Sequence, residues 1–390
     1  MAMKIVNGRV VTPDDIVQQG EVVIRDGIIT QVGQQVPFTD DTIIDAQGSY
    51  VLPGLVDIHG DDIEREIHPR ENAEVDPQIA VTAADRVNIL QGITTKFHAI
   101  AFEDTPAEQR TIDSAFTLSR AIRTSTSLLT DNRVHARCEL SSMDSATVEA
   151  VFNEVDPDLV SLMHHKPGGA QYPDTSSFAQ RFQYQGRGDV VKLEQLVARR
   201  QSLQSSMHDS VVDLIASQAL ARDIPLASHD DDTAEQVASM ADFGISVCEF
   251  PTTMEAATAA RDQGLFTVMG APNFVRGGSL WDNLAAERAV HEGVVDILAS
   301  DYHPPSLLAS IFIGSEGSLP ERVARVTSNP AEAVGLTARG KIVPGFRGDV
   351  IIVDAHPTST VERVIIEGKE CLNVKGTTQK SSPATSLLPR

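Results

Sequence analysis

The chain has 390 residues, of which 41% are hydrophobic, and a net charge of −22 at pH 7. This length exceeds an ordinary small domain but suits an α/β barrel with an appended domain, and the apolar fraction is sufficient for a large core. The negative charge disfavours nucleic acid and anionic membrane surfaces as partners. No run of residues approaches the about 18 consecutive apolar residues of a membrane span.

The cysteines and the first residues indicate a cytoplasmic protein. Cys138, Cys248 and Cys371 are widely separated and show no Cys-x-x-Cys spacing, which argues for a reducing compartment and against a thiolate zinc site. Residues 1–11 lack the charged and then apolar order of a signal peptide. The acidic residues are spread along the chain, as expected of a protein adapted to high salt, where screening keeps a charged surface soluble.

Both ends of the chain are rich in β-forming residues. These segments are, in chain order, 4–11, 21–33, 42–52, 341–354 and 361–370. We therefore expect one small β-sandwich domain formed by both termini, from residues 1–53 and 341–372. The remaining residues, 373–390, are rich in Ser, Thr, Lys and Pro, and we expect a disordered tail there.

The middle of the chain alternates between short apolar runs and stretches of helical periodicity. The apolar runs are 55–61, 94–100, 133–141, 159–165, 224–230, 245–250, 266–273 and 295–301. Helical periodicity marks stretches between them, for example 107–127, 191–222 and 233–243. Eight such units predict a (β/α)₈ TIM-like barrel over residues 54–340, with its chemistry at the carboxyl ends of the strands.

Histidines and carboxylates concentrate where these apolar runs end. The first run ends in His59 and Asp61, and residues i and i+2 of a strand point to the same side, so both side chains face one point. The later runs end in His98; His135, Arg137 and Glu139; His164 and His165; His229 and Asp230; Glu249; Asn273; and Asp301 with His303. Taken singly, each of these histidines is explained as a core residue whose ring is hydrogen-bonded to the backbone. Together they predict a metal cluster at the top of the barrel.

The ligand types indicate which ion such a cluster would hold. Imidazole nitrogen and carboxylate oxygen suit a divalent metal, Zn first with Mn or Fe as alternatives, as one ion or as two bridged by a carboxylate. A bound ion lowers the pKa of its water toward ~7. Asp301 could accept the proton of that water and later donate it. His98 and His135 are either partners that orient the ligands or ordinary core residues.

These motifs resemble the amidohydrolase superfamily. The order of histidines and carboxylates at the strand ends resembles the order of the metal ligands in this superfamily. A signature near the end of the chain, at residues 327–331 and 340–350, resembles that of the superfamily as well. Other segments resemble a group of members that act in phosphonate catabolism. They are Arg137-Cys138-Glu139, Ser228-His229-Asp230-Asp231, Glu249-Phe250-Pro251-Thr252-Thr253, Val275-Arg276-Gly277-Gly278-Ser279 and Ser300-Asp301-Tyr302. The resemblance covers nearly the whole chain and implies a metal-dependent hydrolase of a phosphoanhydride, a diphosphatase that releases pyrophosphate from a sugar 5-triphosphate.

The resemblance also implies a role for each matching residue. The implied metal ligands are His59, Asp61, Glu139, His165, His229 and Asp301, with Asp301 also the catalytic residue. Glu139 would bridge two metals, and a carboxylated Lys96 or Lys166 is the alternative bridge. A polyanionic substrate also needs local cations that outweigh distant carboxylates, which salt screens beyond about 8–10 Å. The candidates for substrate binding are Arg276, the backbone amides of Gly277 and Gly278, Arg65, Lys166 and His303.

The residues leave several alternatives open. Arg65 could instead form a solvated salt bridge with Glu64 or Glu66. Another amidohydrolase reaction, on an amide, a cyclic amide or an acylated sugar, would use the same barrel and metals. A metal-free relative would act as a scaffold or binding protein. His164 and Lys166 differ from the family pattern and bear on the choice of substrate. A homo-oligomer is compatible with the sequence.

Overall fold

The computed structural model describes residues 2–39, 42–70, 73–104, 110–164, 205–279, 283–355 and 358–374. His165, Lys166 and most of the predicted tail, at 375–390, lie outside these ranges. No helix within the described ranges is long and apolar enough to cross a membrane.

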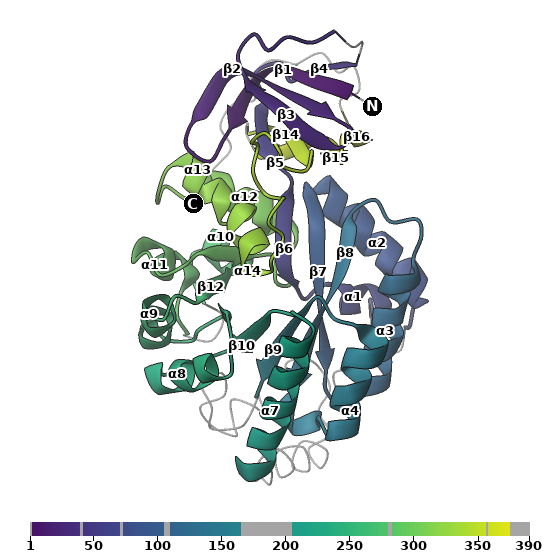
Figure 1. The fold of residues 1–390 in the computed structure, drawn as a ribbon, viewed down its shortest axis with the longest axis vertical. Helices are drawn as coiled ribbons and strands as arrows, with labels where there is room; N and C mark the ends of the chain where they lie inside the picture. The colour runs from purple at the N-terminus through teal and green to yellow at the C-terminus, as the bar shows by residue number, and fades with distance from the viewer. Residues whose placement is uncertain are drawn as a thin grey trace.

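Eight parallel strands form one sheet that makes a nearly closed barrel (Figure 1). Each strand pairs with the next one along the chain, so the order in the sheet is the order in the sequence. The strands are β6 (Leu55–Gly60), β7 (Ile93–Phe102), β8 (Asp131–Glu139), β9 (Leu159–Met163), β10 (Leu226–His229), β11 (Val247–Glu249), β12 (Phe266–Gly270) and β13 (Ile297–Ala299). The predicted barrel is confirmed.

The seam between the first and last strands, β6 and β13, lies next to residues predicted to be functional. A single bridge joins Gly60 to Asp301 in place of a continuous ladder. The Asp301 amide donates to the His59 carbonyl at 2.9 Å, and the Asp61 amide donates to the Asp301 carbonyl at 2.7 Å. The barrel therefore closes at the point where three of the predicted site residues meet.

The interior of the barrel is filled by apolar side chains from almost every strand. Val56, Phe97, Leu159 and Val268 are fully buried members of this cluster. Burying each of these side chains contributes about 1.5–3 kcal/mol. Alternate residues such as Phe102 face the other way, into a second core beneath the helices. The strands are buried on both faces, which explains why they are continuous apolar runs in the sequence.

Helices surround the barrel sheet (Figure 1). They are α1 (Ile63–Ile67), α2 (Pro77–Leu90), α3 (Ile112–Thr124), α4 (Ser145–Ala150), α7 (Ser205–Ala221), α8 (Ala234–Asp242), α9 (Met254–Asp262), α10 (Ala271–Arg276), α11 (Ala286–His291), α12 (Pro305–Ile313), α13 (Leu319–Ala324) and α14 (Ser328–Ala333). Threonine side chains cap three of them: Thr111, Thr233 and Thr253 each accept a hydrogen bond from the amide three residues later. Removing such a cap costs about 1 kcal/mol.

One predicted strand is shorter than expected. The apolar run at 266–273 leaves the sheet at Gly270, and α10 begins at Ala271. Pro272 lies in the first turn of this helix, where backbone N–H groups make no hydrogen bond within the helix. The N–H that proline lacks is therefore not needed there. Asn273 therefore lies on a helix that follows the strand, rather than at the strand end.

A separate mixed sheet is built from both ends of the chain, as expected. Its strands are β1 (Ala2–Val11), β2 (Ile16–Arg25), β3 (Ile28–Gly33), β4 (Ile43–Asp45), β5 (Tyr50–Pro53), β14 (Val350–Asp354), β15 (Thr360–Ile366) and β16 (Lys369–Asn373). β5 joins the two ends, because it pairs with β1 on one side and with β14 on the other. Asp26 and Gly27, between β2 and β3, both have positive φ, as a type I′ hairpin turn requires.

Candidate active site

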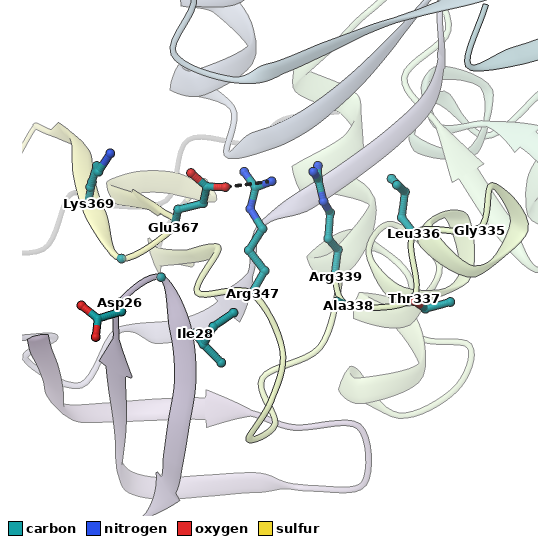
Figure 2. Close-up of a pocket in the computed structure, with 12 residues that line it drawn as sticks. Asp26, Ile28, Gly335, Leu336, Thr337, Ala338, Arg339, Arg347, Glu367 and Lys369 are labelled. Carbon is teal, nitrogen blue, oxygen red and sulfur yellow. Dashed lines mark ion pairs between the residues drawn. The ribbon is translucent and has the colours of Figure 1, made fainter. Parts of the chain in front are cut away.

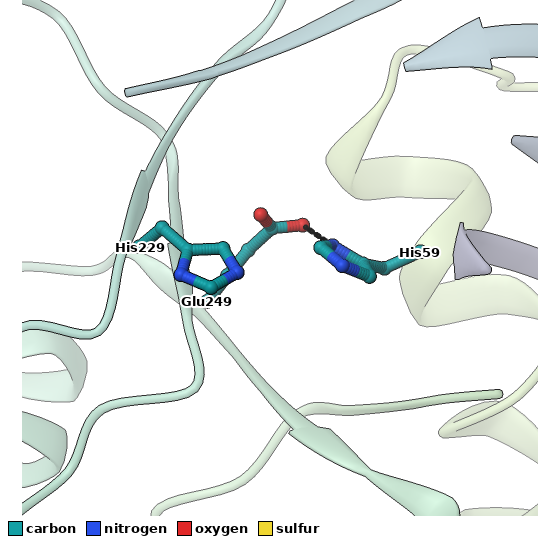
Figure 3. A group of neighbouring side chains, drawn as sticks. All are labelled: His59, His229 and Glu249. Atoms are coloured by element: carbon teal, nitrogen blue, oxygen red, sulfur yellow. Dashed lines mark hydrogen bonds and ion pairs between the residues drawn. The ribbon is translucent and has the colours of Figure 1, made fainter. Parts of the chain in front are cut away.

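Two histidines and a glutamate converge at the carboxyl ends of the barrel strands (Figure 3). His59 belongs to β6, His229 ends β10 and Glu249 ends β11. One ligand atom from each residue lies within 4.8 Å of the other two. Parallel strands bring their carboxyl ends to one rim, so residues as far apart in sequence as His59 and Glu249 meet there.

The Glu249 carboxylate is fixed by hydrogen bonds on both oxygens. His59 Nδ1 lies 2.9 Å from Oε1, and the Ser161 hydroxyl donates to Oε2 at 2.7 Å. Ser161 also contacts His135 Nε2, and His135 Nδ1 lies 3.0 Å from the carbonyl oxygen of Ile58. His135 is thus a partner of the site, one step removed from the cluster.

The charge state of the cluster suits a cation. Burial alone would raise the pKa of Glu249, but His59, which is hydrogen-bonded to this carboxylate, outweighs burial and holds that pKa well below its usual range. Burial lowers the pKa of His135 to about 3. Two imidazoles and one ionised carboxylate face the same point, which is largely shielded from solvent. This ligand set fits a divalent metal of the Zn, Mn or Fe type.

Asp301 lies beside this cluster, two residues after the end of β13. Its φ of 51° is unusual for a residue with a side chain, and its two backbone hydrogen bonds across the seam hold it there. Burial, and then the negative charge of Asp61, raise the pKa of Asp301 to about 6. A carboxyl group with that pKa can exchange a proton near neutral pH.

Two arginines contact Asp61. Arg137 Nη2 donates to Asp61 Oδ1 at 2.9 Å, and Arg110 Nη2 donates to the same oxygen at 3.0 Å. Burial would raise the pKa of Asp61, but the charges of Arg137 and Arg110 outweigh burial and hold the pKa well below its usual range. Asp61 is therefore an ionised carboxylate next to the cluster.

The two described candidates for a metal bridge lie in different surroundings. Glu139 ends β8, is fully buried, and accepts a hydrogen bond from the Ser141 hydroxyl at 2.7 Å. Lys96 Nζ lies 2.7 Å from Asp57, 2.8 Å from Ser300 and 3.0 Å from Asp62. These three acceptors match the three protons of an ammonium group, which favours a protonated Lys96 over a carboxylated one.

Arg65 and Arg276 approach the residue that follows Asp301. The Arg65 guanidinium lies over the Tyr302 ring, 5.7 Å from its centroid. Burial and the charge of Asp301 raise the pKa of Tyr302, whereas Arg276 and Arg65 act in the opposite direction. Both arginines are thus within electrostatic reach of the rim around Asp301.

The glycines beside Arg276 form the end of a helix. The amides of Gly277 and Gly278 donate to the Asn273 carbonyl at 3.1 and 3.2 Å, and Gly277 has a φ of 76°, so it caps α10 in the left-handed conformation. Arg276 in turn donates to the Gly278 carbonyl at 3.1 Å. His303, after β13, lies with its Nδ1 2.8 Å from the Ser306 hydroxyl.

Sequence reasoning missed two features of this site. Glu249 was recognised as a strand-end carboxylate but not proposed as a metal ligand, although its position at the end of an apolar run was the available signal. Arg110 was not recognised at all. It lies just before α3, and no pattern in the sequence connects it to Asp61, which is 49 positions away.

A hollow lies next to the small sheet, at the opposite end of the barrel from His59, His229 and Glu249 (Figure 2). This cavity of about 710 Å³ is lined by Asp26, Arg339, Arg347 and Glu367, among others. Arg339 is already bonded to Asp131 at 2.5 Å, and Arg347 is bonded to Asp349 at 2.9 Å. Because both guanidinium groups are engaged, we interpret this hollow as the joint between the barrel and the small sheet.

Comparison with known proteins agrees with the barrel fold. No protein-family model matches the sequence. The chain is 33% identical over 361 residues to the alpha-D-ribose 1-methylphosphonate 5-triphosphate diphosphatase of Escherichia coli, an alignment that covers 90% of this chain and 94% of the relative. It is 25% identical to the imidazolonepropionase of Symbiobacterium thermophilum, over 87% of this chain and 84% of the relative.

Solved structures share the fold at lower sequence identity. An amidohydrolase aligns with a TM-score of 0.64 at 16% identity, over 96% of this chain and 100% of the other. A Xaa-Pro dipeptidase with bound methionine in its active site aligns with the same TM-score at 17% identity, over 95% of this chain and 99% of the other.

Proposed function

The chain belongs to the amidohydrolase superfamily, in the family of the E. coli diphosphatase, and from this membership we propose that it hydrolyses α-D-ribose 1-methylphosphonate 5-triphosphate in phosphonate catabolism. Water would break one P–O–P bridge of the 5-triphosphate, pyrophosphate would leave, and the 5-phosphate would remain on the sugar. The cluster of His59, His229 and Glu249 would hold a divalent metal, with His165, Glu139, Asp61 and Asp301 as the further proposed ligands.

One observation supports a polyphosphate substrate more than any other. Four arginines gather around the strand ends of a protein whose net charge is −22. Arg110 and Arg137 bond to Asp61, and Arg65 and Arg276 act on Tyr302. Guanidinium groups match the geometry of phosphate oxygens and stay charged at every physiological pH. Asp61, Glu64 and Glu103 offset the charges of Arg110 and Arg137. Arg65 and Arg276 are therefore the arginines that favour a polyphosphate over an amide.

The residues around the cluster suit proton transfer and charge stabilisation. A divalent ion bound there would acidify a water molecule and offset charge on the phosphoryl oxygens. Asp301, with a pKa raised to about 6, can take the proton from the attacking water and return it to the leaving pyrophosphate. Arg276 and Arg65 can offset negative charge on the bridging oxygen as the P–O bond breaks. Ser161 and His135 keep Glu249 in position.

The test is direct. The purified protein, first stripped of metal, is incubated with the ribose triphosphate and Mn or Zn, and phosphorus NMR follows the products. We expect pyrophosphate and the sugar 5-phosphate with metal, and no product in chelator. Simple amides serve as the competing substrate class, and Arg276→Ala should reduce turnover of the triphosphate. Turnover of amides without pyrophosphate release from the triphosphate would contradict the proposed substrate while leaving the hydrolase class intact.

A further inference from the structure

The ring of Phe250 packs against both histidines of the cluster. Its centroid lies 4.7 Å from that of His59 and 5.3 Å from that of His229, and both contacts are edge-to-face. The two imidazoles are themselves 5.6 Å apart (Figure 3), so the three rings form a triangle. Aromatic rings favour edge-to-face contacts over face-to-face stacking. One phenyl ring therefore restricts the orientation of two proposed metal ligands.

The backbone of Phe250 has a conformation that is rare for a bulky residue. Its φ is 52°, in the left-handed region, which a residue with a large side chain seldom occupies. Such strain persists only where the surrounding structure enforces it, and it concentrates at active sites. Glycine would adopt this conformation without strain. What a phenylalanine contributes at this position is therefore its ring.

The chain around Phe250 is anchored to the neighbouring strands on both sides. The Phe250 amide donates to the Val268 carbonyl of β12 at 2.9 Å. On the other side, the Glu249 carbonyl accepts the amide of Asp230, the residue after β10, at 2.9 Å. These bonds fix the backbone between β10 and β12, and they fix the place of the ring at the rim.

A second phenylalanine in the same core does not contact the histidines. Phe250 and Phe266 are both partly buried and pack against the apolar cluster inside the barrel. Phe266 begins β12, whereas Phe250 follows the end of a strand. No ring contact between Phe266 and a histidine occurs within the described ranges. The two residues thus share their chemistry and their core, and they differ in their contact with the imidazoles.

We propose that Phe250 is a positioning residue for the metal centre: its ring holds the imidazoles of His59 and His229 in the orientation in which they and Glu249 face one point. Without the ring the imidazoles would gain rotational freedom, and metal binding would have to remove it again, which lowers the affinity. This inference rests on the metal cluster of the proposed function and deepens it. It does not depend on which substrate is hydrolysed.

The experiment measures metal affinity without substrate. The metal-stripped full-length protein is titrated with Zn against a competing chelator, as wild type, Phe250→Ala, Phe250→Gly and Phe266→Ala. Residues that orient metal ligands contribute about 10–100-fold to metal affinity, so we expect both variants at Phe250 to bind Zn about tenfold or more weakly. Phe266→Ala is the matched control and should bind Zn like the wild type.

Thermal unfolding of the metal-free variants separates positioning from a loss of stability. Phe250→Ala and Phe266→Ala each remove a ring from the core, and both should unfold at a lower temperature than the wild type. Phe250→Gly removes the ring and also relieves the strained backbone. It should unfold at a higher temperature than Phe250→Ala while binding Zn as weakly, and it takes the place of Phe250→Ala if that variant does not fold. A crystal structure of metal-free Phe250→Gly should show the His59 or His229 ring turned from its wild-type orientation.

Folded Phe250 variants that bind Zn like the wild type would overturn the proposal, and so would an equal loss of Zn affinity in Phe266→Ala. Imidazole rings that keep their wild-type orientation in the crystal structure would overturn it as well. Weaker Zn binding in the Phe250 variants, with no pyrophosphate release from the triphosphate by the wild type, would contradict the proposed substrate and leave this inference standing. Pyrophosphate release by the wild type, with unchanged Zn affinity in the Phe250 variants, would contradict this inference alone.

Discussion

Asp61 and Asp301 are neighbouring carboxylates whose pKa values shift in opposite directions. Burial acts to raise both pKa values, but Asp61 has Arg137 and Arg110 beside it, and their charges more than offset burial. For Asp301 the charge of Asp61 adds to burial, and His59 and Arg137 offset these two effects only in part. One group therefore stays ionised while the other can carry a proton near neutral pH, a division of roles that acid–base chemistry uses.

At the residue scale, the proposed metal cluster predicts that Glu249→Gln loses metal affinity. The amide keeps the size of the side chain but removes the charge that attracts the cation. Residues one step outside a metal site typically contribute 10–100-fold to affinity, so a ligand should contribute at least about tenfold. Metal content after dialysis against limiting Zn measures the loss. Glu235→Gln, an exposed residue of α8, is the control, and equal metal content in both variants would contradict the assignment.

At the scale of elements, the seam between β6 and β13 depends on a buried ion pair. Lys96 lies on β7 and bonds to Asp57 of β6 and to Ser300, which follows β13. Asp57 Oδ1 in addition accepts the Ser300 amide at 3.0 Å. These contacts replace part of the ladder that is missing where the barrel closes. Ser300 immediately precedes Asp301 in the chain, so these contacts also hold Asp301 in position.

Lys96→Met should therefore destabilise the protein strongly. Removing one member of a buried pair leaves an uncompensated charge on Asp57, which costs about 3–5 kcal/mol. Urea unfolding monitored by circular dichroism measures the change. The double variant Lys96→Met with Asp57→Asn should recover part of the loss, because the amide needs no counter-charge. A double variant no more stable than Lys96→Met alone would show that the ion pair is not the source of the stability.

Another ion pair joins a residue that follows α14 to the barrel strand β8. It predicts that the stability of the protein depends on pH. Arg339 bonds to Asp131 of β8 and to Thr95 of β7. Burial acts to raise the pKa of Asp131, but Arg339 and then Arg133 outweigh it, so the pKa is lowered on folding. The resulting stabilisation is present above the unfolded-state pKa of ~3.9 and is lost as the pH falls through the lower folded-state value.

Arg339→Gln should accordingly be less stable than the wild type at neutral pH, and the difference should shrink as the pH falls below ~4. The midpoint of urea unfolding, measured at a series of pH values, reports this difference. Arg261→Gln removes an exposed pair with Asp262 and should show little difference at any pH. If the difference in unfolding midpoint between Arg339→Gln and the wild type stays constant across the acid range, the explanation is contradicted.

At the scale of the whole molecule, the net charge of −22 predicts a dependence on salt. Repulsion among surface carboxylates opposes the folded state, and salt screens it. Raising KCl from about 0.1 M to about 1 M shortens the screening length from about 10 Å to about 3 Å. We expect the thermal unfolding midpoint to rise over this range. A midpoint that stays constant or falls would count against adaptation of this surface to high salt.

The barrel could be predicted from the sequence because its strands are buried on both faces and therefore appear as uninterrupted apolar runs. The strand ends then identified His59, His229 and Asp301, since parallel strands gather their carboxyl ends at one rim. The contacts of Arg110 and Arg137 with Asp61 could not be predicted in this way. Arg110 lies just before α3, and neither the period nor the spacing of residues in the sequence places it beside Asp61.

The pairing of β5 with β14 has a consequence for how the chain is made. β5 is translated before any barrel strand, and its partner β14 is translated after all of them. One edge of β5 is therefore unpaired while the whole barrel is synthesised. Translation proceeds from the amino terminus, and the small sheet is therefore completed last. A chain that ends before Val350 has all eight barrel strands but only five of the eight strands of the small sheet, and the open edge of β5 can pair with another chain.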